Sequence, residues 1–462
     1  MHFRTSHGST RPLRVWIVTG LVVASMTVAT AALGTNISHP SAVIEDPANY
    51  TPRLVPDAVA RPYANAVGQS GDRMFVGGRF GTVSDGNGNN RVARQNFMIF
   101  DAATGAAADS PEMDSVVWAI EPYAGTDSPD DDAVFVGGEF SYVDGVAHRR
   151  LVKLDAGTGE VDEAFNAKLP GGRVMDLHMY DGPAGPMLFA AGSAGTKLMA
   201  LDPETGDNTG FLDMNINTPI PNAFGGLSVN NFAISPDGTD LIGVGNFTKV
   251  GAATRARAFR LDLGSTLAEG ATLSPWYYEP FSEVCNVTTA RRLAYLTDVD
   301  FAPDGTWFVI SATGHVSAPG DANKTICDGV GRFETDGPDH PFRPTWINYT
   351  GGDTIWSVAA SGAAVYAQGH FQWMDVEGRL FGDNVNPEAV PRFGVGAVDP
   401  GEYEADGTVI RKGGKALPWN PRKPAQQGGK QLLVTEAGLW VVSDSKRFDG
   451  EPRYGIAFAP LP

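Results

Sequence analysis

Cysteine is scarce in this sequence. Only Cys285 and Cys327 occur among 462 residues, and no histidine accompanies them at the spacing of metal ligands. Two thiols alone make a poor zinc site, which normally needs four nitrogen or sulfur ligands. In an oxidising compartment the default for such a pair is one disulfide, so we expect a Cys285–Cys327 bond.

Positive charge is also in short supply. Lys and Arg number 35 against 53 Asp and Glu, which gives a formal net charge of −18. A surface this negative repels phosphate backbones and anionic lipid head groups, so we expect neither nucleic acid nor an anionic membrane surface as a partner. The sequence contains no phosphate-binding loop, no Gly-x-Ser-x-Gly elbow and no His-Glu-x-x-His helix.

Long apolar runs are limited to one, Val15–Leu33, which follows a basic stretch ending at Arg14. Small residues at Ala29-Thr30-Ala31 offer a cleavage site, yet the run is nearly long enough to span a bilayer. Residues 1–34 are therefore predicted to be a cleaved signal peptide or an uncleaved N-terminal anchor. Both alternatives place residues 35–462, as a single domain, outside the cytoplasm, secreted or membrane-anchored.

Glycine and a repeated motif are what the chain has in abundance. Ala133–Gly159 reads AVFVGGEF, SYVDGVAHRR and LVKLDAGTG, and Phe75–Gly105 repeats it closely. Looser copies recur at intervals of 53 to 75 residues, and their aligned anchors are Gly78, Gly138, Gly192, Gly245, Gly314, Gly369 and Asp444. Self-similarity at this period, with strand-like segments throughout, is typical of a propeller. We predict an all-β fold, a seven-bladed β-propeller of four-stranded antiparallel blades.

The innermost strand of each blade is expected just before the glycine-containing strand. Its predicted positions are Val116–Ile120, Val174–His178, Asn231–Ser235, Leu296–Phe301, Trp356–Ala360 and Leu432–Glu436. The last copy ends at Pro462 without a fourth strand, while Ser41–Ala58 has no partner in its own repeat. We expect this N-terminal strand to supply the missing one and close the ring, which would remove an exposed sheet edge.

The unit VGGxF, a basic residue, LxxLD and a Thr-Gly turn resembles the delta-60 repeat β-propellers, secreted bacterial proteins mostly of unknown function. The resemblance covers nearly all of Ala42–Pro462, and Cys285, Asp298–Gly305 and Cys327-Asp328-Gly329 resemble the cysteine-bearing blade of that family. Copies five and seven depart from the pattern by losing the Gly-Gly pair. The resemblance implies a propeller and an extracellular location, and it brings no catalytic residues.

Loop lengths predict a working face. The long segments, such as Glu279–Ala294 and Gln372–Pro391, fall mainly between second and third strands or between blades. Binding residues concentrate on such loops, so we expect the loop-rich face near blades five and six to carry function. Aromatic residues there could form a platform for sugar rings or an apolar partner. The alternative is that they pack between blades; the candidates are Trp276, Tyr277, Tyr278 and Trp373.

Carboxylates on the predicted inner strands are the candidate catalytic groups. Asp298 and Asp300 alternate along one strand and so share one orientation, as do Asp176 and His178 along another. Paired carboxylates across a channel could act as acid and nucleophile on a glycoside. The alternative is that these groups hydrate a channel or cap neighbouring turns.

Two acidic loops resemble calcium-binding loops, but neither contains the full set of ligands. Asp85–Asn90 places oxygen ligands at alternate positions but lacks the glycine and the final acid of an EF-hand loop, and Asp127–Asp132 is similarly incomplete. We interpret both as solvated loops and expect no cofactor. A basic residue before each third strand is expected to serve the repeat by pairing with an Asp or backbone carbonyls: Arg94, Arg149/Arg150, Lys197, Arg255/Arg257, Arg332, Arg392 and Arg453.

The sequence thus favours a non-catalytic binding module for an extracellular glycan or protein. The alternative is an extracellular propeller hydrolase or lyase acting on carbohydrate through Asp176, Asp298 or Asp300.

Overall fold

A computed structural model describes residues 1–2, 37–124, 132–223, 225–286, 292–314, 325–337, 342–376, 386–424 and 428–462. Within these ranges the regular secondary structure is nearly all β-strand, with no α-helix and one short 3-10 helix at Glu279–Ser282. Residues 32–462 form one compact unit. No helix in the described part is long and apolar enough to cross a membrane. The predicted targeting segment, except for residues 1 and 2, lies outside the described residues.

Each copy of the repeat folds into one antiparallel sheet. In the copy that contains AVFVGG, β8 (Val117–Tyr123) pairs with β9 (Ala133–Gly138), which pairs with β12 (Leu151–Asp155). The Asp-x-x-Thr-Gly turn follows, in which Asp155 Oδ1 accepts the N–H of Thr158 at 2.5 Å and Gly159 takes a φ of +80°. A positive φ is costly for residues with a Cβ, which explains the recurrent glycine. A single bridge from Leu154 to Val161 extends this sheet.

The other copies form sheets with the same antiparallel order. Three are four-stranded: β2 (Tyr63–Ser70), β3 (Arg73–Arg79), β6 (Phe97–Asp101) and β7 (Ala107–Ala108); β16 (Val229–Ile234), β17 (Asp240–Gly245), β20 (Ala258–Leu263) and β21 (Ala271–Leu273); β24 (Tyr295–Phe301), β25 (Trp307–Thr313), β26 (Gly329–Glu334) and β27 (Trp346–Tyr349). Three are three-stranded: β13 (Val174–Gly182), β14 (Gly185–Gly192) and β15 (Leu198–Leu201); β28 (Ile355–Ala360), β29 (Val365–Gly369) and β32 (Val395–Val398); β35 (Gln431–Thr435), β36 (Gly438–Val442) and β39 (Ile456–Pro460).

Short hairpins decorate these sheets, mostly where the second strand leads to the third. They are β4 (Thr82–Ser84) with β5 (Val92–Ala93), β10 (Tyr142–Val143) with β11 (Val146–Ala147), β18 (Lys249–Val250) with β19 (Ala253–Thr254), β22 (Val284–Asn286) with β23 (Arg292–Leu293), β30 (Trp373–Met374) with β31 (Val390–Pro391), β33 (Glu402–Tyr403) with β34 (Val409–Arg411), and β37 (Arg447–Phe448) with β38 (Glu451–Pro452).

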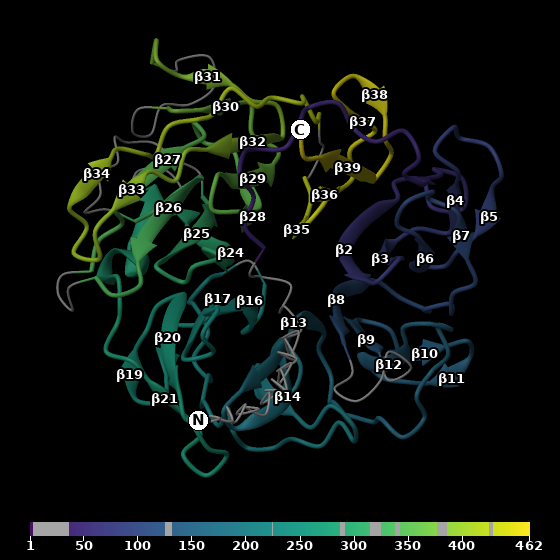
Figure 1. The fold of residues 1–462 in the computed structure, drawn as a ribbon, viewed down its shortest axis with the longest axis horizontal. Helices are drawn as coiled ribbons and strands as arrows, with labels where there is room; N and C mark the ends of the chain where they lie inside the picture. The colour runs from purple at the N-terminus through teal and green to yellow at the C-terminus, as the bar shows by residue number, and fades with distance from the viewer. Residues whose placement is uncertain are drawn as a thin grey trace. The chain divides into compact units, whose positions relative to one another are not determined.

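The first strands of the sheets face a common axis. They contact one another in the order β2, β8, β13, β16, β24, β28, β35 and back to β2. The sheets radiate outward from this ring, so the fold is a β-propeller (Figure 1). Apolar side chains fill the space between adjacent sheets; Phe75 and Phe97, for example, belong to one core cluster with Val134 and Val136. Strands packed on both faces in this way are apolar on both faces.

A β-bulge recurs at the same place in most of these inner strands. The register against the second strand shifts between Val117 and Ala119 in β8 and between Ile355 and Ser357 in β28. Equivalent shifts occur in β2, β13, β16 and β24. A bulge re-aims the inserted side chain. The inserted residues are Asn65, Trp118, Met175, Asn230, Thr297 and Trp356.

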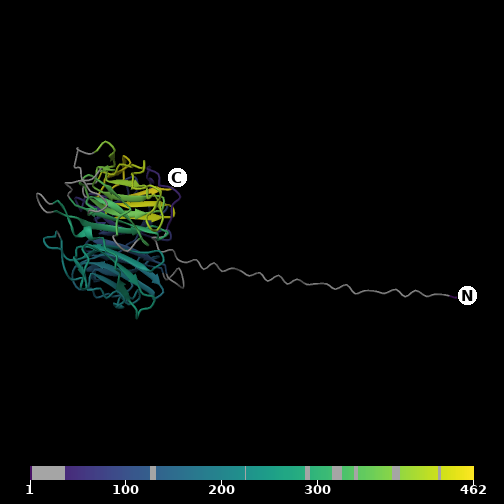
Figure 2. The ribbon, with the colours of Figure 1, turned by 90° about the vertical axis from the view of Figure 1, so that its left-hand side faces the viewer.

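The beginning of the compact unit lies beside the last strand of the chain. The N–H of Ile44 donates to the carbonyl of Pro460 at 2.9 Å, and the N–H of Ala48 donates to that of Phe458 at 2.8 Å. Farther along, β1 (Arg53–Leu54) pairs with β4. In both views the purple N-terminal segment passes close to the yellow C-terminal strands (Figures 1 and 2).

The predicted disulfide is confirmed. Cys285, in β22, is bonded to Cys327, with an S–S distance of 2.04 Å and a Cα–Cα distance of 5.8 Å. Both side chains are buried.

Candidate functional site: the central cavity

A cavity of about 580 Å³ runs along the axis inside the ring of first strands. It reaches the surface among the turns that join first strands to second strands, since Gly71, Ala124 and Ala437 line it. It therefore opens on the short-turn face. The sequence predicts the loop-rich face as the working face, and that remains a prediction. Loop length does not report how wide each end of the channel is, so the mouth of this cavity could not be predicted from it.

One wall of the cavity is charged. Glu121 comes from β8, Asp176 and His178 from β13, and Asp298 and Asp300 from β24. The shared orientation predicted for each alternating pair is thus observed, because all four of those residues line the cavity. Their strands adjoin one another through β16 on this side of the ring.

The rest of the ring contributes small and apolar residues to the lining, together with the polar residues Gln69, Ser70, Gln431 and Thr435. Ala359 comes from β28, Leu432 and Val434 from β35, and Gly68 from β2. Lys430, just before β35, is the cation on this side. The cavity therefore combines an acidic wall with an apolar wall.

Each carboxylate of the charged wall binds the backbone of the next inner strand along the chain. The N–H donors and distances are Met179 to Glu121 at 2.8 Å, Phe232 to Asp176 at 2.8 Å, Val358 to Asp298 at 2.8 Å and Ala360 to Asp300 at 2.7 Å. Adjacent sheets share no strand ladder, so these bonds connect their inner strands. The carboxylates consequently hold neighbouring blades together as well as lining the cavity.

His178 sits at the centre of the charged wall. Its Nε2 lies 3.6 Å from Asp176 Oδ1, and its ring meets Phe232 edge-on at 4.9 Å. Burial alone would lower the pKa of His178, but Asp176, Glu121 and Asp300 together raise it to about 9. The imidazole is therefore a cation at neutral pH.

Burial raises the pKa of the carboxyl groups around it. The pKa of Glu121 rises to about 7 and that of Asp300 to about 7, and in both cases His178 opposes the rise. Burial also raises the pKa of Asp298 well above its ordinary value, helped by Asp176 and Asp300 nearby. Low-dielectric surroundings disfavour a charged carboxylate, and adjacent like charges disfavour it further. These surroundings therefore disfavour full ionisation of Glu121, Asp298 and Asp300 near neutral pH.

Lys430 is a basic residue on the apolar side of the cavity. Its Nζ stands 3.3 Å from the centroid of the Trp356 ring. Burial lowers the pKa of Lys430 to about 7, while Asp298 opposes the change. The indole face stabilises the ammonium through a cation–π interaction.

Of the two alternatives for the aromatic candidates, packing in the core holds for Trp276 and Tyr278. Trp276 and Tyr278 are 2% and 1% exposed and pack in one core cluster. Tyr277 is half-buried, its hydroxyl accepts the N–H of Ala256, and its ring carries the guanidinium of Arg255 at 5.4 Å. Trp373 lies in β30, away from the cavity lining. Buried rings cannot stack on a sugar, so Trp276 and Tyr278 serve the core.

Two other tryptophans, which were not predicted as site residues, lie on the inner strands. Trp118 and Trp356 are the bulged residues of β8 and β28, and both keep some exposure. Arg173 stacks on Trp118 at 5.2 Å, as Lys430 does on Trp356. Neither indole lines the cavity. Both lie within predicted inner strands, Val116–Ile120 and Trp356–Ala360, which was the available signal, but strand alternation cannot reveal a bulge.

The acidic loop at Asp85 is closed by its own carboxylate. Asp85 Oδ1 accepts the N–H groups of Asn87 and Asn89 at 2.9 and 2.8 Å, and Oδ2 accepts Asn90 Nδ2 at 2.8 Å. In the part of the chain that the structure describes, no group of three or more acidic, histidine or cysteine side chains could hold a metal ion. Residues 127–131 of the second acidic loop lie outside the described ranges.

Basic residues of the repeat bind backbone carbonyls. The acceptors are Ala108 for Arg94, Phe140 for Arg150, Gly195 for Lys197, Ser274 for Arg255, Phe281 for Arg257, Pro400 for Arg332, Leu417 for Arg392 and Ala48 for Arg453. This agrees with a structural role in each copy and leaves none of these residues in the cavity lining.

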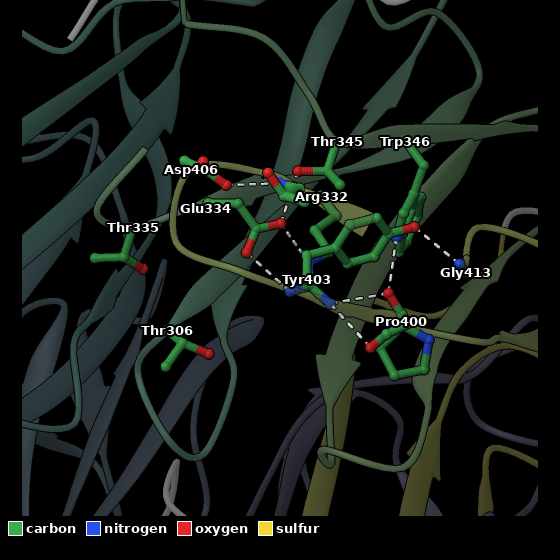
Figure 3. A network of polar contacts seen from close by, with 12 residues as sticks. Thr306, Arg332, Glu334, Thr335, Thr345, Trp346, Pro400, Tyr403, Asp406 and Gly413 are labelled. Carbon is green, nitrogen blue, oxygen red and sulfur yellow. Dashed lines mark hydrogen bonds and ion pairs between the residues drawn. The ribbon is translucent and has the colours of Figure 1, made fainter. Parts of the chain in front are cut away.

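Arg332 has the most elaborate of these environments (Figure 3). It is 2% exposed and makes two 2.8 Å bonds to Glu334. Its guanidinium lies between the rings of Trp307 and Tyr403, at 4.5 and 4.7 Å. The network fastens the segment after β32 to the preceding sheet.

Comparison with known proteins adds no family. No protein-family model matches the chain, and no curated protein matches it. Among solved structures, the RRP9 WD40 repeats are 10% identical, with 91% of this chain and 100% of that chain covered and a TM-score of 0.48. The computationally designed Ika8 protein is 12% identical, with 87% and 97% covered and a TM-score of 0.42. Hydrazine synthase of Kuenenia stuttgartiensis is 14% identical, with 70% and 78% covered and a TM-score of 0.38.

Proposed function

We propose that this chain is an extracellular, non-catalytic binding module, a seven-bladed propeller that holds its ligand in the central cavity. The observation that carries the proposal is the cavity itself. It is large enough for a sugar ring or a peptide side chain, and it combines an apolar wall with a few fixed polar groups, as ligand sites generally do. The partner would be a glycan or a protein that presents an exposed sugar ring or side chain to this cavity.

The proposal of seven blades is supported by the seven sheets whose first strands contact one another around the axis. Closure of the ring by the N-terminal segment is supported by one repeated bond. In the first sheet, Arg94 donates to the carbonyl of Ala108, which lies in the fourth strand, at 2.8 Å. In the last sheet, Arg453 donates to the carbonyl of Ala48 at 3.1 Å. This correspondence between Ala108 and Ala48 supports the proposal that the N-terminal segment supplies the fourth strand of the last sheet.

A carbohydrate hydrolase or lyase fits this geometry less well. An acid and a nucleophile need free carboxyl oxygens that flank the scissile bond. Here both oxygens of Asp298 accept backbone N–H groups, from Val299 and Val358, and both oxygens of Asp176 accept them from Leu177 and Phe232. These carboxylates are held by the fold, which favours the binding module.

Glycan and peptide arrays probed with matched variants test the proposal. Ala359→Phe narrows the cavity from its apolar wall, and Gln69→Trp obstructs its exposed mouth. Tyr142→Ala removes an exposed ring from the hairpin β10–β11 and is the control. We expect both cavity variants, checked for an unchanged melting transition, to lose binding that the control keeps. Loss only in Tyr142→Ala, or hydrolysis of a bound glycan, would overturn the proposal.

A further inference from the structure

We propose that the group recognised in the central cavity is a cation, an ammonium or guanidinium on a short apolar stem such as a lysine or arginine side chain. The inference rests on the proposed function and adds the chemical class of the ligand.

The cavity has a surplus of acidic groups. Four carboxyl groups lie within the ring of inner strands, on Glu121, Asp176, Asp298 and Asp300, and only His178 supplies a cation among them. Two more acids, Asp132 and Glu436, line the cavity toward the turns, and Lys430 lines it from the side of β35. A low-dielectric enclosure strengthens the attraction of such a site for a positive charge.

The cavity also has a surplus of hydrogen-bond acceptors. Glu121 accepts the N–H of Met179 through a single oxygen, which leaves acceptor capacity on the other. Asp300 accepts backbone N–H groups from Ala360 and Phe301. Asn231 Oδ1 lines the cavity region, is buried and has no partner. An unpaired buried acceptor is costly. An ammonium offers three donors and no acceptor, and a guanidinium offers five donors, so either group would satisfy this set.

The protonation of the charged wall predicts how cation binding depends on pH. Burial raises the pKa of Glu121 and Asp300 to about 7 and that of Asp298 well above its ordinary value, so protons partly neutralise the wall near neutral pH. A bound cation would replace those protons. Binding should therefore release protons and strengthen as the pH rises from 6 to 8. The titratable groups facing the site are Glu121, Asp132, Asp176, His178, Asp298, Asp300, Lys430 and Glu436.

The apolar wall is the reason for proposing that the cationic group is carried on a short apolar stem. Ala359, Leu432 and Val434 line the side away from the carboxylates. Lys430 does not occupy the acidic wall, because its ammonium is placed over Trp356. A ligand with a cationic head and a chain of a few methylenes can thus contact both walls, whereas an anion would face four carboxyl groups.

The test uses four probes of the same length: butylammonium, butylguanidinium, 1-butanol and butyrate, titrated into the full-length protein by NMR and calorimetry at pH 7.5. We expect the two cations to bind at least tenfold more tightly than butanol, with butyrate weakest. Calorimetry in buffers of different ionisation enthalpy should show proton release on cation binding. The double variant Asp298→Asn/Asp300→Asn should remove the preference, while Asp213→Asn, an exposed carboxylate outside the cavity lining, should keep it.

The outcomes separate the two proposals. If butanol binds as tightly as the cations and Ala359→Phe abolishes the binding of both, the inference that the ligand is a cation is overturned. The cavity then remains the proposed binding site. Cation binding that survives in Asp298→Asn/Asp300→Asn would also overturn it. If none of the four probes perturbs cavity signals at millimolar concentration, the cation inference fails, and array binding by the same cavity variants still decides the proposed function.

Discussion

At the scale of the residue, the carboxyl groups on the axis have two duties that conflict. Asp300 accepts the N–H of Ala360 at 2.7 Å and so helps to join two sheets, but burial raises its pKa to about 7. A protonated carboxyl still accepts that bond through its carbonyl oxygen, and the fold avoids a buried charge. The interstrand hydrogen bond and the raised pKa are therefore compatible. As a consequence, the free energy of unfolding depends on pH.

Asp300→Asn should make that dependence visible. Because the folded-state pKa of Asp300 lies above its ordinary value of 3.8, the folded chain keeps a proton that the unfolded chain loses between those values. Protonation of Asp300 therefore contributes its full share to the free energy of unfolding below pH about 4, and this contribution is lost as the pH rises through about 7. Asparagine keeps the acceptor without ionising. The variant should gain about 2–4 kcal/mol over wild type between pH 4 and pH 8.

Urea denaturation at pH 4.5 and pH 8 measures this change, with Asp213→Asn as the control at an exposed site. An equal pH dependence in wild type and Asp300→Asn would contradict the account of the charged wall.

Arg332 gives a second prediction at this scale. Arg332→Met leaves Glu334, which is 9% exposed, without its partner and breaks the bond to Pro400. Removing one member of a buried ion pair costs about 3–5 kcal/mol. The matched control is Arg411→Met, whose side chain is 48% exposed and pairs with Asp399 and Glu402. An exposed pair contributes about 0–1 kcal/mol. Equal losses of unfolding free energy in both variants would show that burial does not govern the Arg332 network.

Some of these residues could be predicted from the sequence and others could not. Asp176, Asp298 and Asp300 followed from the repeat, since the strand before the glycine motif is the inner one and alternate residues share a side. The burial of Trp276 did not follow, because an aromatic residue at the end of an outer strand and one in a surface platform have the same local pattern. Lys430 was missed because it precedes its strand.

At the scale of the element, the inner strands owe their geometry to a repeated bulge. Side chains at the bulge also reach across to the next sheet: Asn65 Nδ2 donates to the carbonyl of Val117 at 3.3 Å, and Thr297 Oγ1 donates to that of Ile355 at 2.9 Å. The alternation of side chains between the two faces of a strand can be predicted from the sequence only if the register is unbroken. A bulge shifts that register by one residue, so Trp118 and Trp356 could not be assigned to the axis from the sequence.

The N-terminal segment supplies the prediction at this scale. Ala48→Pro removes the N–H that donates to the carbonyl of Phe458 at 2.8 Å. If this segment closes the ring, the loss should lower the free energy of unfolding by about 3 kcal/mol and speed amide exchange in β39. Asp46→Ala changes an exposed side chain in the same segment and should have little effect. Ordinary stability and unchanged exchange in Ala48→Pro would indicate that the ring does not depend on this strand.

At the scale of the whole molecule, the two faces of the propeller differ in kind. The loop-rich face has the long connections that the sequence makes obvious, whereas the cavity opens among the short turns. Turn lengths can be read from the repeat. The width of the channel at each end depends on which side chains point inward from separate sheets, and that requires the assembled ring. The antiparallel order of the strands in each sheet was therefore predictable, and the mouth of the cavity was not. The prediction of four strands in every sheet holds for three sheets, and the other four have three strands each.

The location of the binding site is the central claim, and hydrogen–deuterium exchange with and without the tightest array ligand tests it most directly. The account predicts slower exchange at the amides that bond to the charged wall, those of Met179, Val358 and Ala360, and no change in the hairpins β10–β11 and β30–β31. Protection confined to those hairpins, with the inner strands unaffected, would contradict it.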